Sequence, residues 1–342
     1  MGARSIINRR DVLCQVAGSV SASLIAGTCR ARAEDEGKRF PSRQITFIVP
    51  FAAGGPTDIV ARFVAARLAE SLGSPVIVEN RPGGSTSIAS AAVARALPDG
   101  HTLMAVDISV VVAPHLSNFG IDILKSFKAV GQSAKSQLLL MVSPALSTPT
   151  VADFIELAKA KVEGITIGHP GIGTTPHVAA ITFMKATQIN PLLVSYRGQA
   201  AANNDLLSGQ ISALFAAVPL AVGLAQSGKV QVLGVTGTKR IGALPGVPTF
   251  GESGIRMTGF EDGSWYGVVA PAKTPDDIVT KLNTALNRIA EDNEAKEKLI
   301  ALGLEPTVST PQEFQGLIED QYTYWGKLLG PADTIAKELI HQ

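Results

Sequence analysis

The chain has 342 residues, of which 46% are hydrophobic and 17% are charged. Its formal net charge of +1 argues against a nucleic-acid partner, because such proteins concentrate basic side chains on one face. The length allows two domains with a large core, as in a compact α/β protein.

The first 33 residues are expected to be an export signal peptide that is cleaved near Ala33. Arg9 and Arg10 precede a mostly apolar stretch, and Ala31-Arg32-Ala33 supplies a small-x-small cleavage site. The adjacent arginines resemble a twin-arginine signal, and an ordinary secretory signal remains the alternative. The expected location of the mature protein is therefore the periplasm.

Both cysteines, Cys14 and Cys29, lie inside this leader. Lipid attachment at Cys29 is the less favoured alternative, because Thr28 before it fits such a site poorly. After cleavage the mature chain has no thiol for catalysis or disulfide formation.

The first structural motif is an apolar strand that begins at Ile45 and meets a Gly54-Gly55-Pro56-Thr57-Asp58 turn. A segment of helical period follows from Ile59 to Leu72. A strand that ends at a helix N-terminus directs backbone N–H groups and a positive helix dipole at one point. The motif supplies neither a nucleophile nor a base, so it indicates binding of a carboxylate or phosphate.

Two further strands complete the first unit. Residues 75–80 form the second strand, residues 81–87 a turn rich in small hydroxyl side chains, residues 88–97 a helix and residues 101–106 a third strand. This βαβαβ order predicts a parallel sheet with right-handed crossovers.

The second unit repeats the opening motif. A strand at 165–168 leads into a turn from His169 to His177, and a helix follows at 178–187. Around this motif the sequence predicts strands at 137–142, 192–196, 211–218 and 230–235, and helices at 151–161 and 203–208, with Thr150 as a cap.

The chain then returns to the first unit. Residues 245–259 predict a long irregular connection, and residues 265–271 predict a strand. Helices follow at 275–291, 294–302 and 311–329, with Thr274 and Thr310 before their prolines as caps. Crossings near 138–145 and 264–271 predict two hinged lobes with the ligand between them, and we assign residues 44–140 and 267–342 to lobe 1 and 141–266 to lobe 2.

The ordered set of motifs resembles the Bug family, the periplasmic solute-binding receptors of tripartite tricarboxylate transporters. The resemblance spans the whole mature chain and is carried by Val49 to Asp58, Val78 to Gly83, Pro98 to Leu103, Gly171 to His177, Tyr196 to Gly198, Asp205 to Gln210, Leu244 to Thr249 and Trp265 to Pro271.

The resemblance implies a Venus-flytrap α/β fold, each lobe a mostly parallel sheet flanked by helices. It also implies a small carboxylate ligand, di-, tri- or aromatic, held by the loop from Phe51 to Asp58 and the loop from Gly171 to His177. The implied partners are membrane transporter subunits, and we expect a monomer.

The sequence departs from the family pattern in three places. Ser85, Thr86 and Ser87 stand where the family commonly has Gly-Gly-Asn, and their hydroxyls add possible donors to the ligand. Ala216 stands where an Asp is frequent, which disfavours an amino-acid ligand. Arg197 replaces a frequent Lys, and its planar guanidinium suits a bidentate carboxylate contact.

The candidate ligand-binding residues are Phe51, Ala53, Gly54, Gly55, Thr57, Asp58, Ser85, Thr86, Ser87, Gly171, Gly173, Thr174, Thr175, His177, Arg197 and Gly198. For Thr57 and Asp58 helix capping is an equal alternative, and a structural role is favoured for the Asp58 side chain because it would repel a carboxylate. His177 either donates to the ligand or packs at the helix start.

No enzyme signature, metal-ligand spacing or cofactor fingerprint is found, since Gly171-x-Gly173 lacks the third glycine of a dinucleotide loop. The sequence therefore predicts a non-enzymatic receptor without catalytic residues, metal or cofactor. A periplasmic hydrolase or isomerase and a sensory receptor for a signalling partner remain alternatives, because both would use the same anion-binding loops.

Overall fold

A computed structural model describes residues 40–117, 119–161 and 164–329. The expected signal peptide and both cysteines lie outside these residues. By its internal contacts the chain divides into residues 1–43 and residues 44–342, and the fold below is that of the second unit.

The first of two sheets has the strand order β11-β4-β10-β3-β1-β2. Its strands are β1 (Ile45–Val49), β2 (Val76–Asn80), β3 (Thr102–Asp107), β4 (Phe127–Ser136), β10 (Ser264–Pro271) and β11 (Leu304–Pro306). The pairings of β1 with β2 and β3 are parallel, as the βαβαβ order predicts. The pairings of β10 with β3 and β4, and of β11 with β4, are antiparallel. The sheet is therefore mixed, because β10 enters it from the second sheet and runs against its neighbours.

The second sheet has the order β7-β6-β8-β5-β9. Its strands are β5 (Leu138–Val142), β6 (Thr166–His169), β7 (Leu192–Ser195), β8 (Ala213–Ala217) and β9 (Gln231–Val235). Strand β6 is parallel to β7 and β8, whereas β5 is antiparallel to β8 and β9. This sheet is also mixed, with its parallel half around the second predicted loop.

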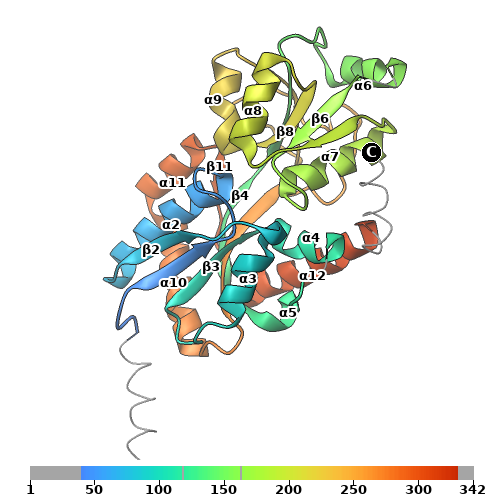
Figure 1. Cartoon of the computed structure of the whole chain (residues 1–342). Coiled ribbons are helices and arrows are strands. Elements are labelled where there is room, and N and C mark those ends of the chain that lie inside the picture. The colour runs from blue at the N-terminus through green and yellow to red at the C-terminus, as the bar shows by residue number, and fades with distance from the viewer. Residues whose placement is uncertain (1–39, 118, 162–163, 330–342) are drawn as a thin grey trace, which may run out of the picture. The chain divides into compact units, whose positions relative to one another are not determined.

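Helices flank each sheet and complete the two lobes (Figure 1). Lobe 1, the first sheet with its helices, contains α2 (Pro56–Leu72), α3 (Ser87–Ala94), α4 (Ser109–Leu116), α5 (Ile123–Ser126), α10 (Asp276–Glu291), α11 (Asn293–Ala301) and α12 (Pro311–Leu329). Lobe 2, the second sheet with its helices, contains α6 (Val151–Ala160), α7 (Thr175–Thr187), α8 (Gln199–Ser208) and α9 (Val218–Gln226). The predicted two-lobed α/β fold is confirmed, but the expectation of mostly parallel sheets is wrong, because β10 and β11 in lobe 1 and β5 in lobe 2 pair antiparallel with their neighbours.

Most expected elements are present, and five α-helices and strands of the described residues were not predicted: α4, α5, β4, α9 and β11. Two of the three predicted threonine caps are confirmed, since Thr150 and Thr310 each accept from the backbone N–H three residues on, at 3.2 and 3.1 Å. The predicted cap at Thr274 is wrong. Its buried hydroxyl donates to the Pro271 carbonyl at 2.7 Å, and Pro275 occupies the cap position of α10.

The chain passes between the sheets at two places. A single residue, Gln137, joins β4 to β5, and residues 236–263 lead from β9 back to β10. The two crossings are tied together, because the Thr236 hydroxyl donates to Gln137 Oε1 at 3.0 Å and accepts from the Leu138 N–H at 2.9 Å. The lobes therefore share one hydrogen-bonded hinge.

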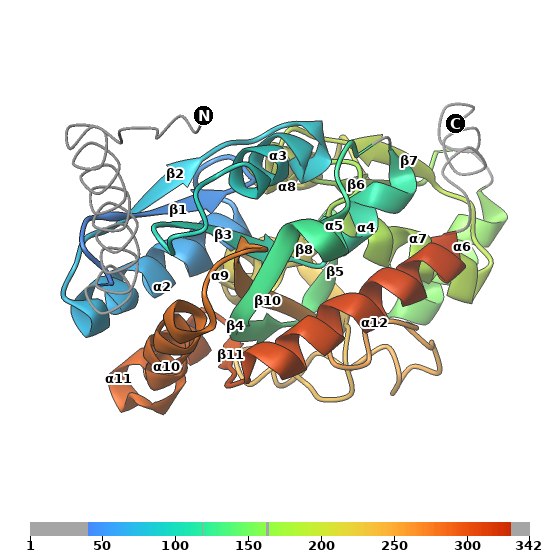
Figure 2. The same ribbon diagram turned by 90° about the horizontal axis from the view of Figure 1, so that it is seen from below.

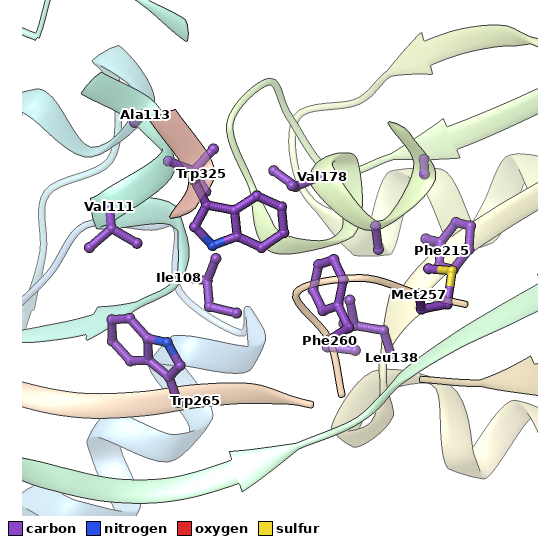
Figure 3. Packing of buried hydrophobic residues seen from close by; sticks show 14 of the residues in the cluster. Ile108, Val111, Ala113, Leu138, Val178, Phe215, Met257, Phe260, Trp265 and Trp325 are labelled. Carbon is purple, nitrogen blue, oxygen red and sulfur yellow. The ribbon is translucent and has the colours of Figure 1, made fainter. Parts of the chain in front are cut away.

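One buried apolar cluster contains residues from both lobes. Trp325 of α12 is fully buried in it, and Figure 3 shows its indole amid Val111 of lobe 1 and Val178 of lobe 2. The Phe260 ring packs against it with centroids 5.4 Å apart. Figure 2 shows α12 running from β11 toward α7, where Lys185 Nζ donates to the Leu328 carbonyl at 3.2 Å. Helix α12 thus contacts both lobes.

Candidate functional site

The first candidate loop joins β1 to α2. Gly54 has φ of 80°, a conformation that glycine adopts without strain. Gly55 is the N-cap of α2 and Pro56 opens the helix, with no side-chain cap hydrogen bond. Ala53 and Gly54 are exposed, while Phe51 and Gly55 are half-buried. The uncapped helix start leaves backbone N–H donors facing the loop.

Asp58 holds this loop in place. Its Oδ2 accepts from the Gly54 N–H at 2.8 Å and from Arg62 Nε at 2.9 Å, and its Oδ1 accepts from Asn80 Nδ2 at 2.7 Å. The same Asn80 amide donates to the Phe51 carbonyl at 3.0 Å. Burial pushes the pKa of Asp58 upward, but the hydrogen bonds from Arg62, Gly54 and Asn80 outweigh it and hold the pKa below its usual value. These contacts support the structural role for its side chain.

Thr57 is also engaged within lobe 1. Its hydroxyl donates to Asp107 Oδ2 at 2.7 Å, and the Ser109 N–H donates to Asp107 Oδ1 at 2.8 Å. Asp107 ends β3, and its burial raises the pKa of the carboxyl group. The carboxyl ends of β1, β2 and β3 are thus cross-linked through Asp58, Asn80 and Asp107.

The second loop, between β2 and α3, contains a left-handed turn. Ser85 has φ of 47° and Thr86 has φ of 78°, in the region that L-residues rarely occupy. Thr86 is the N-cap of α3, yet its side chain makes no cap hydrogen bond. Thr86 is buried, while Ser85 and Ser87 are half-buried.

The third loop joins β6 to α7 in lobe 2. Thr174 is the N-cap of α7 without a side-chain cap hydrogen bond, because its hydroxyl donates to the Gly171 carbonyl at 2.6 Å. Gly173 has φ of 78° and is buried, and Gly171 is half-buried. Like α2, helix α7 begins with uncapped N–H groups behind a glycine turn.

Two imidazoles in contact, with their ring planes tilted by 45°, fix this third loop. The Gly171 N–H donates to His169 Nδ1 at 3.3 Å and the Gly173 N–H donates to His177 Nδ1 at 3.2 Å, with ring centroids 4.2 Å apart. Burial lowers the pKa of His169 to about 4, and burial together with the His169 ring lowers the pKa of His177 to about 3. Both rings are therefore neutral at pH 7, and because Nδ1 accepts, the proton of each lies on Nε2.

Two candidate residues, Arg197 and Gly198, follow β7. Arg197 is exposed. Gly198 has φ of 101°, and its N–H donates to the Pro170 carbonyl at 3.1 Å. Gly198 thus ties the β7–α8 loop to the β6–α7 loop.

The loops of the two lobes meet at one point. The Ser85 hydroxyl donates to the Ile172 carbonyl at 3.2 Å, although 87 residues separate them. A Cβ placed on Gly173 would lie 3.6 Å from Ser85 Cβ and 3.7 Å from Ala113 Cβ of α4. The structure therefore brings together the second and third predicted loops.

Three buried polar atoms in these loops have no hydrogen-bond partner within the described part of the chain. They are Thr86 Oγ1 from lobe 1, and Thr175 Oγ1 and His177 Nε2 from lobe 2. An unpartnered buried polar group is unfavourable, so groups of this kind on facing loops point to a binding function.

Several residues of the site escaped the sequence-based prediction: Arg62, Asn80, Asp107 and Ser109. The position of Asn80 and Asp107 could have indicated them, since each is the last residue of a parallel strand in the first sheet.

Within the described residues, no group of three or more His, Cys, Asp or Glu side chains is placed to hold a metal ion. The same residues contain no helix with the length and apolarity that crossing a membrane demands.

The chain is similar to known proteins over most of its length. It is 31% identical to the UPF0065 protein in the tcbD-tcbE intergenic region of Pseudomonas sp. (strain P51), covering 94% of both chains. It is 30% identical to the protein BugT of Bordetella pertussis, covering 84% of this chain and 88% of BugT.

Solved structures agree with the fold. The periplasmic binding protein BugD is 33% identical, with a TM-score of 0.78 over 84% of this chain and 97% of BugD. Rpa4515 of R. palustris with adipate is 33% identical, with a TM-score of 0.79 over 84% of this chain and 96% of that one. MatC from Rhodopseudomonas palustris with bound malate is 28% identical, with a TM-score of 0.78 over 85% of this chain and all of MatC.

The family described as "Tripartite tricarboxylate transporter family receptor" matches residues 60–333, which include the β2–α3 and β6–α7 loops and begin within α2, after the β1–α2 loop. The chain therefore belongs to the family of tripartite tricarboxylate transporter receptors.

Proposed function

We propose that this protein captures a small organic carboxylate between its two lobes and delivers it to the membrane subunits of a tripartite tricarboxylate transporter. The observation that carries the proposal is the matched pair of uncapped helix starts, at α2 in lobe 1 and α7 in lobe 2. Each follows a glycine turn at the carboxyl end of a parallel strand, where backbone N–H groups favour an anion. Adipate and malate, held by Rpa4515 and MatC, are both carboxylates.

The ligand we propose is a plain carboxylate rather than an amino acid. Ala216 is fully buried in an apolar cluster with Leu139 and Val218, so this position offers no acceptor to an ammonium group. Asp58 is engaged by Gly54, Arg62 and Asn80 and so does not face the ligand as a free charge. Arg197 is exposed, and we keep it as a contact for a ligand group at the edge of the site.

The proposal extends to cell location and assembly. We propose export with cleavage of residues 1–33, a periplasmic monomer, and lobe boundaries at residues 44–140, 141–266 and 267–342.

The proposed receptor acts without catalysis. Within the described residues the loops hold the neutral His169 and His177. Both Nδ1 atoms accept from backbone N–H groups, so they are not free to act as bases.

The decisive experiment identifies the ligand. Mass spectrometry of gently purified protein is expected to recover a compound with at least one carboxylate, and thermal-shift screening should show stabilisation by RT ln(1+[L]/Kd) with the ligand returned unchanged. Chemical conversion of the bound compound would establish an enzyme instead. Recovery of only a sugar or a cationic metabolite would refute the carboxylate assignment.

A pair of glycine variants tests the first loop. Gly54 and Gly228 have φ of 80° and 69°, and a Cβ on either meets no atom within 4 Å. Alanine at each should destabilise the protein similarly, by about 1 kcal/mol, because both positions are left-handed. Only Gly54→Ala should weaken carboxylate binding, since its Cβ would occupy space that the ligand needs. Equal affinities for the two variants would place the ligand elsewhere.

A further inference from the structure

The turn after β2 is unusual in its backbone. Gly83, Gly84, Ser85 and Thr86 all have positive φ, at 119°, 57°, 47° and 78°. Glycine accepts this conformation, but Cβ of an L-residue crowds the following carbonyl, and a β-branched residue such as Thr86 is most disfavoured. Non-glycine residues held in such conformations cluster at functional sites.

The conformation also separates Thr86 from its ordinary role. The N-cap threonine of α6, Thr150, has φ of −128° and accepts from the backbone three residues on. Thr86 occupies the same position before α3 but cannot direct its hydroxyl back at the helix. Its residue is 2% exposed, and Oγ1 has no partner within the described chain. The strained turn thus holds a buried hydroxyl that makes no hydrogen bond within the described residues to offset its loss of hydration.

The turn faces the other lobe. Ser85 donates to the Ile172 carbonyl, and its Cβ would lie 3.6 Å from a Cβ placed on Gly173. The hydroxyl of Thr86 is therefore next in sequence to the contact between the lobes. The unpartnered Thr175 Oγ1 and His177 Nε2 belong to the first turn of α7 in lobe 2. A ligand enclosed between the two lobes would supply hydrogen-bond partners to these polar groups of both lobes.

We propose that Thr86 is a specificity-determining residue, whose hydroxyl donates to an oxygen of the bound carboxylate compound, and that Ser85 positions the turn by its bond to Ile172. The inference rests on the proposed function as a carboxylate receptor. It predicts that the turn improves binding at the expense of stability, so that variants at Thr86 change the two properties in opposite directions.

Three substitutions separate the hydroxyl from the strain. Thr86→Val keeps the β-branched shape and removes the hydroxyl, Thr86→Ser keeps a hydroxyl, and Thr86→Gly removes both the hydroxyl and the strain. Thr182→Val is the matched control, because Thr182 is also buried but its hydroxyl already donates to the Val178 carbonyl at 2.9 Å.

The experiment measures binding of adipate, malate and succinate by calorimetry, and the melting temperature of each ligand-free variant. Thr86→Val and Thr86→Gly should weaken binding about tenfold or more, as expected for one lost hydrogen bond to a charged group. Thr86→Ser should stay within about threefold of the natural protein, and Thr86→Gly should melt higher than it.

Two results would overturn the inference while leaving the proposed function intact: tight binding by Thr86→Val, or equal losses for Thr86→Val and Thr86→Ser. If the natural protein binds none of the three compounds and retains no carboxylate on purification, the proposed function fails and the inference fails with it.

Discussion

The backbone N–H of Gly54 donates to the carboxylate of Asp58 at a distance of 2.8 Å, so the first turn of α2 holds the loop that precedes it. Asp58 is 2% exposed and also binds Arg62 and Asn80, the latter reaching the Phe51 carbonyl. One buried acid thus organises both ends of the β1–α2 loop. The acid of this motif therefore holds the loop of the proposed anion site in place through its own hydrogen bonds.

Asp58→Asn should destabilise the protein at pH 7 by about 1–3 kcal/mol, because the new amide cannot accept from three donors. The folded-state pKa of Asp58 lies below its unfolded value of 3.8, so its stabilisation is present above that value and is lost as the pH falls through the folded pKa. The difference in unfolding free energy between the natural protein and Asp58→Asn, measured by urea denaturation, should therefore become smaller below about pH 4.

Glu70→Gln provides the matched control for this experiment. Glu70 also lies on α2 and pairs with Arg67 at 3.0 Å, but its side chain is 66% exposed. Its removal should change stability by less than about 1 kcal/mol. Similar losses for Asp58→Asn and Glu70→Gln would contradict the role assigned to Asp58.

The sequence predicts this part of the molecule well because the interactions are local. A strand of β-branched residues, a glycine turn and a helix start within fourteen residues determine the loop, and the same pattern at β6 and α7 locates its counterpart. The capping boxes at Thr150 and Thr310 are equally local, since each hydroxyl bonds a backbone group three residues away.

The unpredicted elements depend on distant partners. Strand β4 carries Lys128, Gly131, Gln132 and Lys135 among its residues and shows no regular apolar alternation. Two of its backbone groups bond to residues far away in the sequence: the Gln132 N–H donates to Ser309 Oγ at 2.9 Å, and Asn283 Nδ2 donates to the Val130 carbonyl at 2.8 Å. No local pattern contains that information.

The same limit applies to the site. The hydroxyls of Ser85 and Thr86 are visible in the sequence as departures from a glycine-rich pattern, but their left-handed backbone is not. The bond from Ser85 to Ile172 joins loops of different lobes, so it requires the complete fold. The predicted strand at 211–218 includes Val218, because this residue is apolar and β-branched, whereas Val218 and Pro219 form the first turn of α9.

The His169–His177 pair should make the protein acid-sensitive. Their pKa values in the folded protein are lowered from 6.5 to about 4 and about 3, so the unfolded chain binds more protons below pH 6.5. The free energy of unfolding is therefore unaffected by this pair above pH 6.5. It decreases as the pH falls from 6.5 toward 4, by about 1.4 kcal/mol per pH unit and per imidazole. Urea denaturation at pH 7, 6 and 5 measures the slope.

The double variant His169→Asn/His177→Asn keeps an acceptor near each glycine N–H and removes the titration. Its stability should vary less with pH than that of the natural protein over the same range. Titration of the two rings by NMR gives an independent check, since neither should protonate above pH 5. An unchanged pH slope in the double variant would show that other groups cause the acid sensitivity.

Trp325 should be a major contributor to stability, because its fully buried indole packs in the cluster shared by both lobes and donates from Nε1 to Gln321 Oε1 at 2.7 Å. Trp325→Ala is expected to cost about 3–5 kcal/mol in denaturant unfolding. Trp325→Phe should cost less, since it keeps most of the apolar volume. Val308→Ala, at a side chain 55% exposed, should be nearly neutral and serves as the control.

The hinge offers a test of coupling between the two crossings. Gly237 has φ of 80°, and a Cβ there would collide with the Gln137 side chain. Gly237→Ala should therefore destabilise the protein through two effects: a left-handed alanine, at about 1 kcal/mol, and displacement of Gln137 from its bond with Thr236. Gln137→Ala removes both the obstacle and the acceptor of that bond, so in the double variant the bond is lost only once and the left-handed alanine adds its own cost. A double-mutant cycle in urea should give a coupling of at least about 0.5 kcal/mol, and strict additivity would mean that the crossings are independent.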